Sequence, residues 1–314
     1  MSETIDILLA TYNGARFVRE QLDSLAAQTH RDWRLLVRDD GSTDDTMAIV
    51  RAWAEACDRP VEIIEDGRKG LGASQNFGAL LEKSTAPYFA FCDQDDVWLP
   101  EKLEVMLAAM RAEEAEVGDA TPVMMFCDLE VVDENLVQIA ASFWGLSRIK
   151  TQPKYLRPEQ VMLRNPLTGC ASMGNAALRQ IGTPVPAGSR MHDWWLAMVA
   201  AYFGRLLPIA RLFVKYRQHG GNAIGATNLN GWWMVRDFIT RPRSALKRAV
   251  AVRDSSQLQA LTFSRRFQLS NIPTDSIVKY SQLNRLSLIN RKFFILKRVM
   301  SASFGYYLAL LFVS

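Results

Sequence analysis

The amino-acid sequence predicts an α/β protein built on a doubly wound, mainly parallel sheet. Apolar, β-rich runs alternate with helical segments from Ile5 to about Val117, and parallel neighbours need such helical crossovers. Turn residues directly follow several of these runs. With 49% apolar residues in 314 positions the chain can bury a sizeable core, which excludes a disordered or low-complexity protein.

Periodicity and turn residues place four strands and the helices between them. The strands are expected at 5–10, 33–37, 61–64 and 88–92. Helices are expected to begin near Phe17, after Thr43, at Ala73 and at Pro100, the last running to about Val117. The hydroxyl of Thr43 suits a helix cap, and proline is favoured at a first helical position.

Polar side chains stand at the ends of three of these strands, at positions 11–13, 39–40 and 93–96. Ligands of a doubly wound sheet bind beyond the carboxyl ends of its strands, so these side chains are expected to share one site. Taken separately, each group is also explained by an ordinary turn or helix cap, and that structural interpretation stays open.

The run Asp93-Gln94-Asp95-Asp96 places three acids directly after an apolar strand. Carboxylates this close repel one another unless protons or a cation neutralise them. Oxygen ligands favour Mg²⁺ or Mn²⁺, which commonly bind one or two carboxylates together with substrate phosphates. A nucleotide diphosphate fits that demand, although the sequence has neither a Walker A motif nor a strand-linked GxGxxG. Tyr12 can stack on a base, and Asp39 or Asp40 can accept its ring N–H.

Four motifs in this order resemble the signature of the family 2 glycosyltransferases of GT-A fold. They are Thr11-Tyr12-Asn13-Gly14, the stretch 37–46, Asn76-Phe77-Gly78 and the stretch 93–100. The resemblance covers roughly residues 4–225. It implies a nucleotide-sugar donor, a divalent cation held by Asp93 and Asp95, and inversion at the anomeric carbon. The expected nucleotide-binding residues are Thr11, Tyr12, Asn13, Asp39, Asp40, Asn76 and Asp93.

Inverting transfer in one step needs a general base for the acceptor hydroxyl. Asp193, in Met191-His192-Asp193-Trp194-Trp195, matches the position of the family's base, with His192 where the family more often has an acid. A plain helix-cap role for Asp193 is the structural alternative. Trp194 and Trp195 can stack on an acceptor sugar or pack in the core.

A second segment of the acceptor half, Tyr216-Arg217-Gln218-His219, ends a predicted strand before a glycine pair. His219 is a candidate metal ligand and Arg217 a candidate clamp for the diphosphate, with a solvated surface loop as the alternative. Together with the motifs around Asp95 and Asp193, this segment most resembles bacterial rhamnosyltransferases of O-antigen and polysaccharide assembly. The stretch 167–172 corresponds to a segment that borders the acceptor in that family.

The net charge of +4 hides an asymmetry. Residues 231–314 hold 14 basic and 3 acidic side chains, a charge of +11, and residues 1–230 hold 23 basic and 30 acidic side chains, a charge of −7. Basic residues beside aromatic ones, as in 291–298, suit a helix lying on an anionic membrane. The uncharged stretch 299–314 falls short of the ~20 residues that span a bilayer. A helical subdomain with a solvated basic face is the alternative for 245–281, and no nucleic-acid-binding module is recognised.

The sequence therefore predicts a GT-A catalytic domain at 1–228, with a nucleotide-binding part at about 1–100 and an acceptor part at about 101–228, and a helical, membrane-associating region at 229–314. The expected activity is transfer of a sugar, with dTDP-rhamnose favoured over a UDP-linked donor, to a bacterial polysaccharide or lipid-linked glycan. Widely spaced cysteines and an acidic N-terminus favour a cytoplasmic enzyme on the inner face of the inner membrane. Self-association stays open. A nucleotidyltransferase and an inactive glycan-binding scaffold are the alternative functions.

Overall fold

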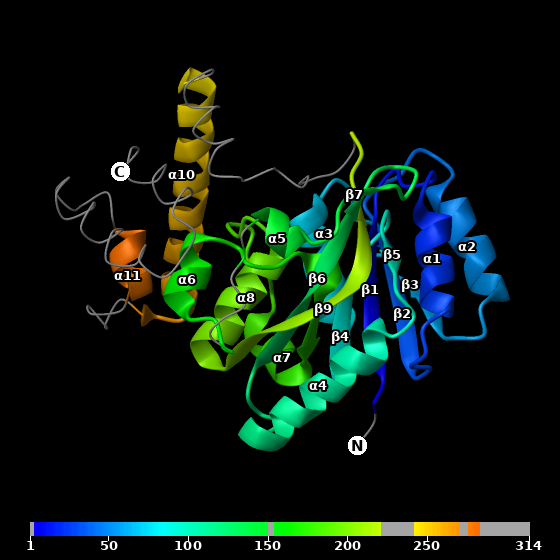
Figure 1. Cartoon of the computed structure of the whole chain (residues 1–314), viewed down its shortest axis with the longest axis horizontal. Helices are drawn as coiled ribbons and strands as arrows, with labels where there is room; N and C mark the ends of the chain where they lie inside the picture. Colours follow the sequence, from blue (N-terminus) through cyan, green and yellow to red (C-terminus); the bar gives the residue numbers. More distant parts are fainter. Residues whose placement is uncertain (1–2, 148, 150–153, 221–241, 270–275, 283–314) are drawn as a thin grey trace.

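The computed structural model describes residues 3–147, 149, 154–220, 242–269 and 276–282. A central sheet carries helices on both faces, and the long helix α10 (Pro242–Arg266) stands at one end of the molecule (Figure 1). The expected α/β class is confirmed, and the described C-terminal residues include helices, as predicted.

The sheet has nine strands in the order β3-β2-β1-β4-β8-β6-β9-β5, with β7 paired to β6 beside this path. The strands are β1 Ile5–Thr11, β2 Trp33–Asp39, β3 Val61–Ile63, β4 Tyr88–Asp93, β5 Val97–Trp98, β6 Val123–Val132, β7 Gln138–Ala140, β8 Ser172–Asn175 and β9 Arg205–Arg217. The block β3-β2-β1-β4 is entirely parallel, whereas β8 runs antiparallel to both β4 and β6. The second half of the sheet is therefore mixed.

Helices connect these strands and cover them. They are α1 Val18–Ala26, α2 Thr46–Ala56, α3 Ala73–Lys83, α4 Lys102–Val117, α5 Phe143–Ser147, α6 Pro158–Leu163, α7 Ala176–Gly182, α8 His192–Phe203, α10 and α11 Ser276–Ser281, with a short 3₁₀ turn η1 at Gly169–Ala171. None of the helices in the described part of the chain combines the length and the apolar character needed to cross a bilayer.

Alternating side chains of each strand supply two separate apolar cores. From β1, Ile5, Ile7 and Leu9 pack with α1, α2 and α4, whereas Leu8 faces the core formed with α3 and α8. This is the period-2 alternation of a strand buried on both faces. The second core extends into the C-terminal region, because Phe263 of α10 and residues of α11 pack there.

The element boundaries follow the sequence closely in the first half. Helix α3 spans the expected residues, and β4 extends one residue past its predicted end. The predicted capping by Thr43 is wrong, because α2 begins at Thr46 and the Asp44 carboxylate accepts the Thr46 N–H at 3.1 Å. The proposed boundary at 228 and the stretch 291–314 lie outside the described residues.

Candidate functional site

The carboxyl ends of β1, β2 and β4 lie side by side, as predicted for the three polar groups. Thr11 is the register partner of Asp39, and Ala10 is the partner of Asp93. Parallel pairing thus brings residues as far apart in the chain as Ala10 and Asp93 to one edge of the sheet.

The Asp39 carboxylate shapes the turn after β2. It accepts hydrogen bonds from the Thr11 hydroxyl at 2.8 Å, from the Ser42 hydroxyl at 2.5 Å, and from the N–H groups of Gly41 and Ser42 at 3.0 and 2.7 Å. A carboxylate has about four acceptor sites, so these bonds leave no free site on Asp39 for a base. In this structure Thr11 and Asp39 stabilise the turn after β2 by hydrogen bonds within the protein.

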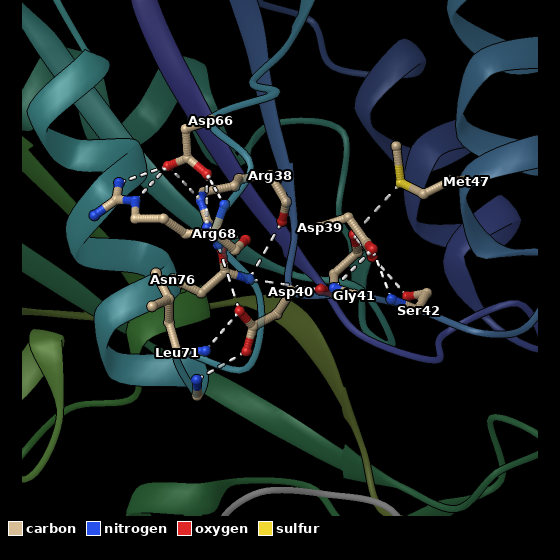
Figure 2. Close-up of polar contacts among 12 residues, drawn as sticks. Arg38, Asp39, Asp40, Gly41, Ser42, Met47, Asp66, Arg68, Leu71 and Asn76 are labelled. Atoms are coloured by element: carbon tan, nitrogen blue, oxygen red, sulfur yellow. Dashed lines mark hydrogen bonds and ion pairs between the residues drawn. The ribbon is translucent and has the colours of Figure 1, made fainter.

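Asp40 instead holds the loop before α3, as Figure 2 shows. Its two carboxylate oxygens accept the N–H groups of Leu71 and Gly72, each at 2.8 Å. The buried guanidinium of Arg38 lies 3.5 Å from Asp40 and 2.9 Å from Asp66. Asp40 therefore keeps acceptor capacity, and the loop above it is fixed by charge pairs as well as by backbone bonds.

Asn76 joins the same network from the first turns of α3. Its Oδ1 accepts a hydrogen bond from Arg38 at 2.7 Å, and its Nδ2 donates to the Arg38 carbonyl at 3.2 Å (Figure 2). The side chain is buried and bonded within the protein. Asn76, expected to touch the nucleotide, is placed here as a support of the β2 end.

Tyr12 and Asn13 form the outer rim of this edge. The Tyr12 side chain is 57% exposed, which leaves its ring available for stacking. The Gln94 amide pins the loop by accepting the Tyr12 N–H and donating to the Tyr12 carbonyl, both at 2.9 Å. The Oδ1 of Asn13 accepts the Thr43 N–H at 2.8 Å, which ties the rim to the loop after β2. Gln94 thus links the first and third polar groups.

Acidic side chains crowd at the end of β4. Burial, followed by the charges of Asp95 and Asp193, raises the pKa of Asp93 to about 7. Burial also raises the pKa of Asp96 well above its usual value. Both shifts disfavour the charged forms of these acids, and a cation bound beside them would favour the charged forms again.

His219 meets Asp95 at this cluster, as the sequence hypothesis required. Its Nε2 lies 2.8 Å from Asp95 Oδ2, although 124 residues separate the two in the chain. Adjacent oxygen and nitrogen ligands of one octahedral cation have about this separation, ~3 Å. Asp95 and His219 therefore have the spacing of two adjacent ligands of one divalent cation.

A second group with potential ligand atoms lies deeper in the protein. Atoms of Asp93, Asp96 and Cys170 lie within 4.8 Å of one another. Burial raises the pKa of the Cys170 thiol well above its usual value, so it remains protonated. Because hard cations prefer oxygen ligands, a protonated thiol is a poorer ligand for them than the Asp95 carboxylate.

Arg217 is not placed as a diphosphate clamp, which corrects the prediction from sequence. Its side chain is buried beneath the loop after β4. Its Nε donates to the Asp95 carbonyl at 2.8 Å, and its backbone N–H donates to Asp96 Oδ1 at 3.0 Å. The guanidinium therefore stabilises the loop after β4 through the Asp95 carbonyl. The pairing of β5 with β9 brings Arg217, the last residue of β9, next to this loop.

Asp193 lies in the first turn of α8, close enough to Asp93 for its charge to raise the pKa of that group. Burial raises the pKa of Asp193 itself to about 6, and hydrogen bonds from the Trp194 N–H and from Asn165 and Gly169 partly oppose this. A carboxylate with that pKa is ionised at neutral pH and still basic enough to accept a proton. The expected base thus lies beside the expected metal site.

His192, next to this base, is a neutral core residue. Its ring stacks on Phe77 with a centroid distance of 4.2 Å and meets the edge of Phe91 at 4.4 Å. Burial lowers its pKa to about 3. The family's usual acid is replaced here by a group that carries no charge at neutral pH.

Trp194 and Trp195 are core residues as well. Of the two roles considered from the sequence, the structure shows core packing and not stacking on an acceptor. Their side chains are 4% and 0% exposed. The indole N–H groups donate to the carbonyls of Val161 and Gly182 at 2.6 and 2.7 Å. Neither ring has a free face for a sugar.

Comparison with known proteins decides the family. The model of glycosyl transferase family 2 matches residues 6–181, more than half of the chain. The chain belongs to glycosyl transferase family 2. The matched segment includes the three strand ends and the cluster after β4, and ends before Asp193 and His219.

Relatives within this family are distant. An uncharacterised glycosyltransferase of Nostoc sp. is 27% identical over 227 residues, which cover 69% of this chain and 66% of that protein. A β-1,3-glucosyltransferase of Escherichia coli, WfgD, is 29% identical over 34% of this chain and 40% of its own length. The chain spans less than two thirds of each of these relatives.

Solved structures share the fold. The TarS fragment 1–349 of S. aureus, solved with UDP-GlcNAc, has a TM-score of 0.54 at 16% identity, covering 96% of this chain and 82% of that one. The mannosyltransferase PcManGT of Pyrobaculum calidifontis, solved with GDP-Man and Mn²⁺, has a TM-score of 0.53 at 16% identity, covering 98% and 85%. The family 2 chain thus has the GT-A fold that its motifs indicated.

Several residues of the site were not identified from sequence. Arg38 and Asp66 stabilise the loop over Asp40, and Gln94 joins two motifs. Lys102 is fully buried near the acids, its Nζ donating to the Cys170 carbonyl and lying 3.1 Å from the Trp98 ring centroid. A lysine a few residues after an acidic motif is the signal in the sequence that would have suggested a positive charge compensating these acids.

Proposed function

We propose that this family 2 protein is an inverting, metal-dependent glycosyltransferase that uses a nucleotide-sugar donor. The observation that carries the proposal is the position of Asp193, a buried carboxylate with a pKa of about 6 beside the Asp93 cluster. A general base and a cation site so close together suit the two ends of one displacement reaction, in which the cation would neutralise the leaving diphosphate.

The chemistry of this chain follows from those positions. Asp193 accepts the proton of the acceptor hydroxyl while the acceptor oxygen forms a bond to the anomeric carbon. The bond from that carbon to the diphosphate oxygen breaks, and its electron pair leaves with the nucleoside diphosphate. A divalent cation, when bound by Asp93, Asp95 and His219, neutralises the negative charge of the diphosphate. Mg²⁺ and Mn²⁺ both suit this donor set.

On the donor side, Tyr12 is proposed to stack on the base and Asp40 to accept its ring N–H. The exposure of Tyr12 and the acceptor capacity of Asp40 support these roles. For the sugar we propose rhamnose from dTDP-rhamnose, on the resemblance of the motifs around Asp95, Asp193 and His219 to rhamnosyltransferases. For the acceptor we propose a growing glycan or a lipid-linked glycan at the cytoplasmic face of the inner membrane.

Asp193→Asn tests the base assignment. It should lower the transfer rate by at least about 10³-fold, because the amide cannot take the hydroxyl proton. Binding of the nucleotide diphosphate should persist, because Asp193 lies on the acceptor side. Transfer is measured by release of the nucleoside diphosphate, and binding by thermal shift with dTDP and UDP, each with and without Mn²⁺.

The same experiment separates the alternatives. Near-normal turnover of Asp193→Asn would show that another group is the base. A metal-dependent shift that is selective for dTDP supports the rhamnosyl donor, and a UDP-selective shift redirects the donor assignment.

A further inference from the structure

The guanidinium of Arg217 lies directly behind the expected cation ligands. Its Nε donates to the carbonyl of Asp95 at 2.8 Å, and its side chain is 2% exposed. A permanent positive charge opposes binding of a divalent cation nearby, and the repulsion is stronger where little water screens it. The site therefore needs a counter-charge for Arg217 that does not come from the cation ligands.

Glu20 supplies such a counter-charge from the first turn of α1. Its carboxylate accepts a hydrogen bond from Arg217 Nη2. Glu134 accepts a hydrogen bond from Arg217 through its backbone carbonyl, at 2.6 Å, while its carboxylate pairs with Arg16 at 2.8 Å.

The same group of side chains also supports His219. The Phe17 ring centroid lies 4.6 Å from the central carbon of the Arg217 guanidinium and 4.7 Å from the His219 ring centroid. Phe17 directly precedes α1, and Glu20 follows in its first turn. The start of α1 thus contacts both Arg217 and the imidazole that faces Asp95.

We propose that Glu20 is a positioning residue for the divalent cation. It neutralises Arg217 and holds the guanidinium against Phe17 and the loop after β4, so that Asp95 and His219 remain available to the cation. The inference rests on the proposed metal-dependent function. An acid in the first turn also stabilises its helix, which explains the residue type but not its contact with a buried arginine 197 positions away.

The test measures Mn²⁺ binding to the full chain without nucleotide. Free Mn²⁺ is followed by its electron paramagnetic resonance signal, and the dissociation constant is obtained by titration. Glu20→Gln should raise that constant on the order of tenfold, because it leaves one charge without its partner close to the site. Glu20→Asp keeps the charge and should restore most of the affinity.

Asp23→Asn is the matched control. It removes the same charge from the same helix, where Asp23 pairs with Arg19 at 2.9 Å and both side chains are more than half exposed. Its Mn²⁺ affinity should equal that of the wild type. The midpoint of thermal unfolding without metal should change by only a few degrees in Asp23→Asn, because exposed pairs contribute little to stability. Glu20→Gln should lower it further, because its partner Arg217 is buried.

Two results overturn the inference. One is wild-type Mn²⁺ affinity in Glu20→Gln, even if its unfolding midpoint is lowered, since that pattern belongs to a purely structural residue. The other is equal weakening in Glu20→Gln and Asp23→Asn, which would be a general charge effect. Absence of Mn²⁺ binding in the wild type, both alone and with UDP or dTDP present, would refute the metal-dependent function itself, and the role of Glu20 with it.

Discussion

Asp193 and His192 are neighbours in the chain, and burial moves their pKa values in opposite directions. Burial disfavours whichever form is charged, so the pKa of Asp193 rises to about 6 and that of His192 falls to about 3. At neutral pH the first is a carboxylate and the second an uncharged ring. Asp193 is therefore the stronger base of this pair, because an imidazole with a pKa of about 3 has little affinity for a proton at neutral pH.

The pH dependence of transfer follows from this assignment. Because the base must be ionised, the turnover number at saturating metal and substrates should increase as pH rises through about 6 and level off above ~7. Below pH 6 it should fall about tenfold per pH unit. A pH–rate profile measures this, and a limb near the ordinary carboxylate value of 3.8 would mean that a more exposed acid is the base.

At the scale of elements, the loop between β3 and α3 is held by one buried arginine. Arg38 bonds to Asp66, to Asn76 and to the Arg68 carbonyl, at 2.9, 2.7 and 2.7 Å. Hydrogen bonds from Arg38, and then from Arg68, hold the pKa of Asp66 well below its usual range. The loop over Asp40 is thus part of the fold around β2.

Arg38→Met should lower the free energy of unfolding by about 3–5 kcal/mol, because it leaves buried polar partners without their counter-charge. Arg51→Met is the control, since the Arg51–Glu65 pair is exposed on both sides and should contribute less than about 1 kcal/mol. Urea unfolding of both variants measures the difference. Equal losses in the two variants would contradict the central role given to Arg38.

At the scale of the whole molecule, the described C-terminal helices share a core with the catalytic part. Phe263 of α10 lies 5.5 Å from Trp195, centroid to centroid, and Gln259 accepts the Arg190 N–H at 3.1 Å. The hydroxyls of Ser256 and Tyr280 join α10 to α11 at 2.7 Å. The described part of 245–281 is therefore helical and packs against α8, whereas the solvated basic face expected for this stretch stays a prediction.

The basic stretch 291–298 remains a proposed membrane contact. We expect the protein to bind vesicles containing phosphatidylglycerol, and not vesicles of phosphatidylcholine alone, with weaker binding at high salt. Replacing its four basic residues with serine should abolish flotation with the vesicles, since each contributes roughly 1 kcal/mol. Replacing four exposed arginines of the first half, Arg16, Arg19, Arg51 and Arg111, should not. Equal loss in both variants would indicate a non-specific charge effect.

The sequence by itself determined the fold class, most element boundaries of the first half and the residues that converge on the site. The fold class and boundaries follow from local periodicity, and Asp93 and Asp95 could be selected from the rule that parallel strands end at one edge. Asp193 and His219 were selected from the resemblance of their motifs to family 2 glycosyltransferases. All four could be proposed as site residues because their residue types and motif positions are visible in the chain.

Only the tertiary structure decided which polar side chains face the site and which support it. Thr11, Asp39, Asn76 and Arg217 have the residue types of ligand-binding groups, but each is hydrogen-bonded within the protein, and all except the partly exposed Asp39 are buried. Burial and partners depend on contacts between residues far apart in sequence, such as Glu20 with Arg217. Local patterns contain no information about such contacts, which is why the supports of this site could not be read from the chain.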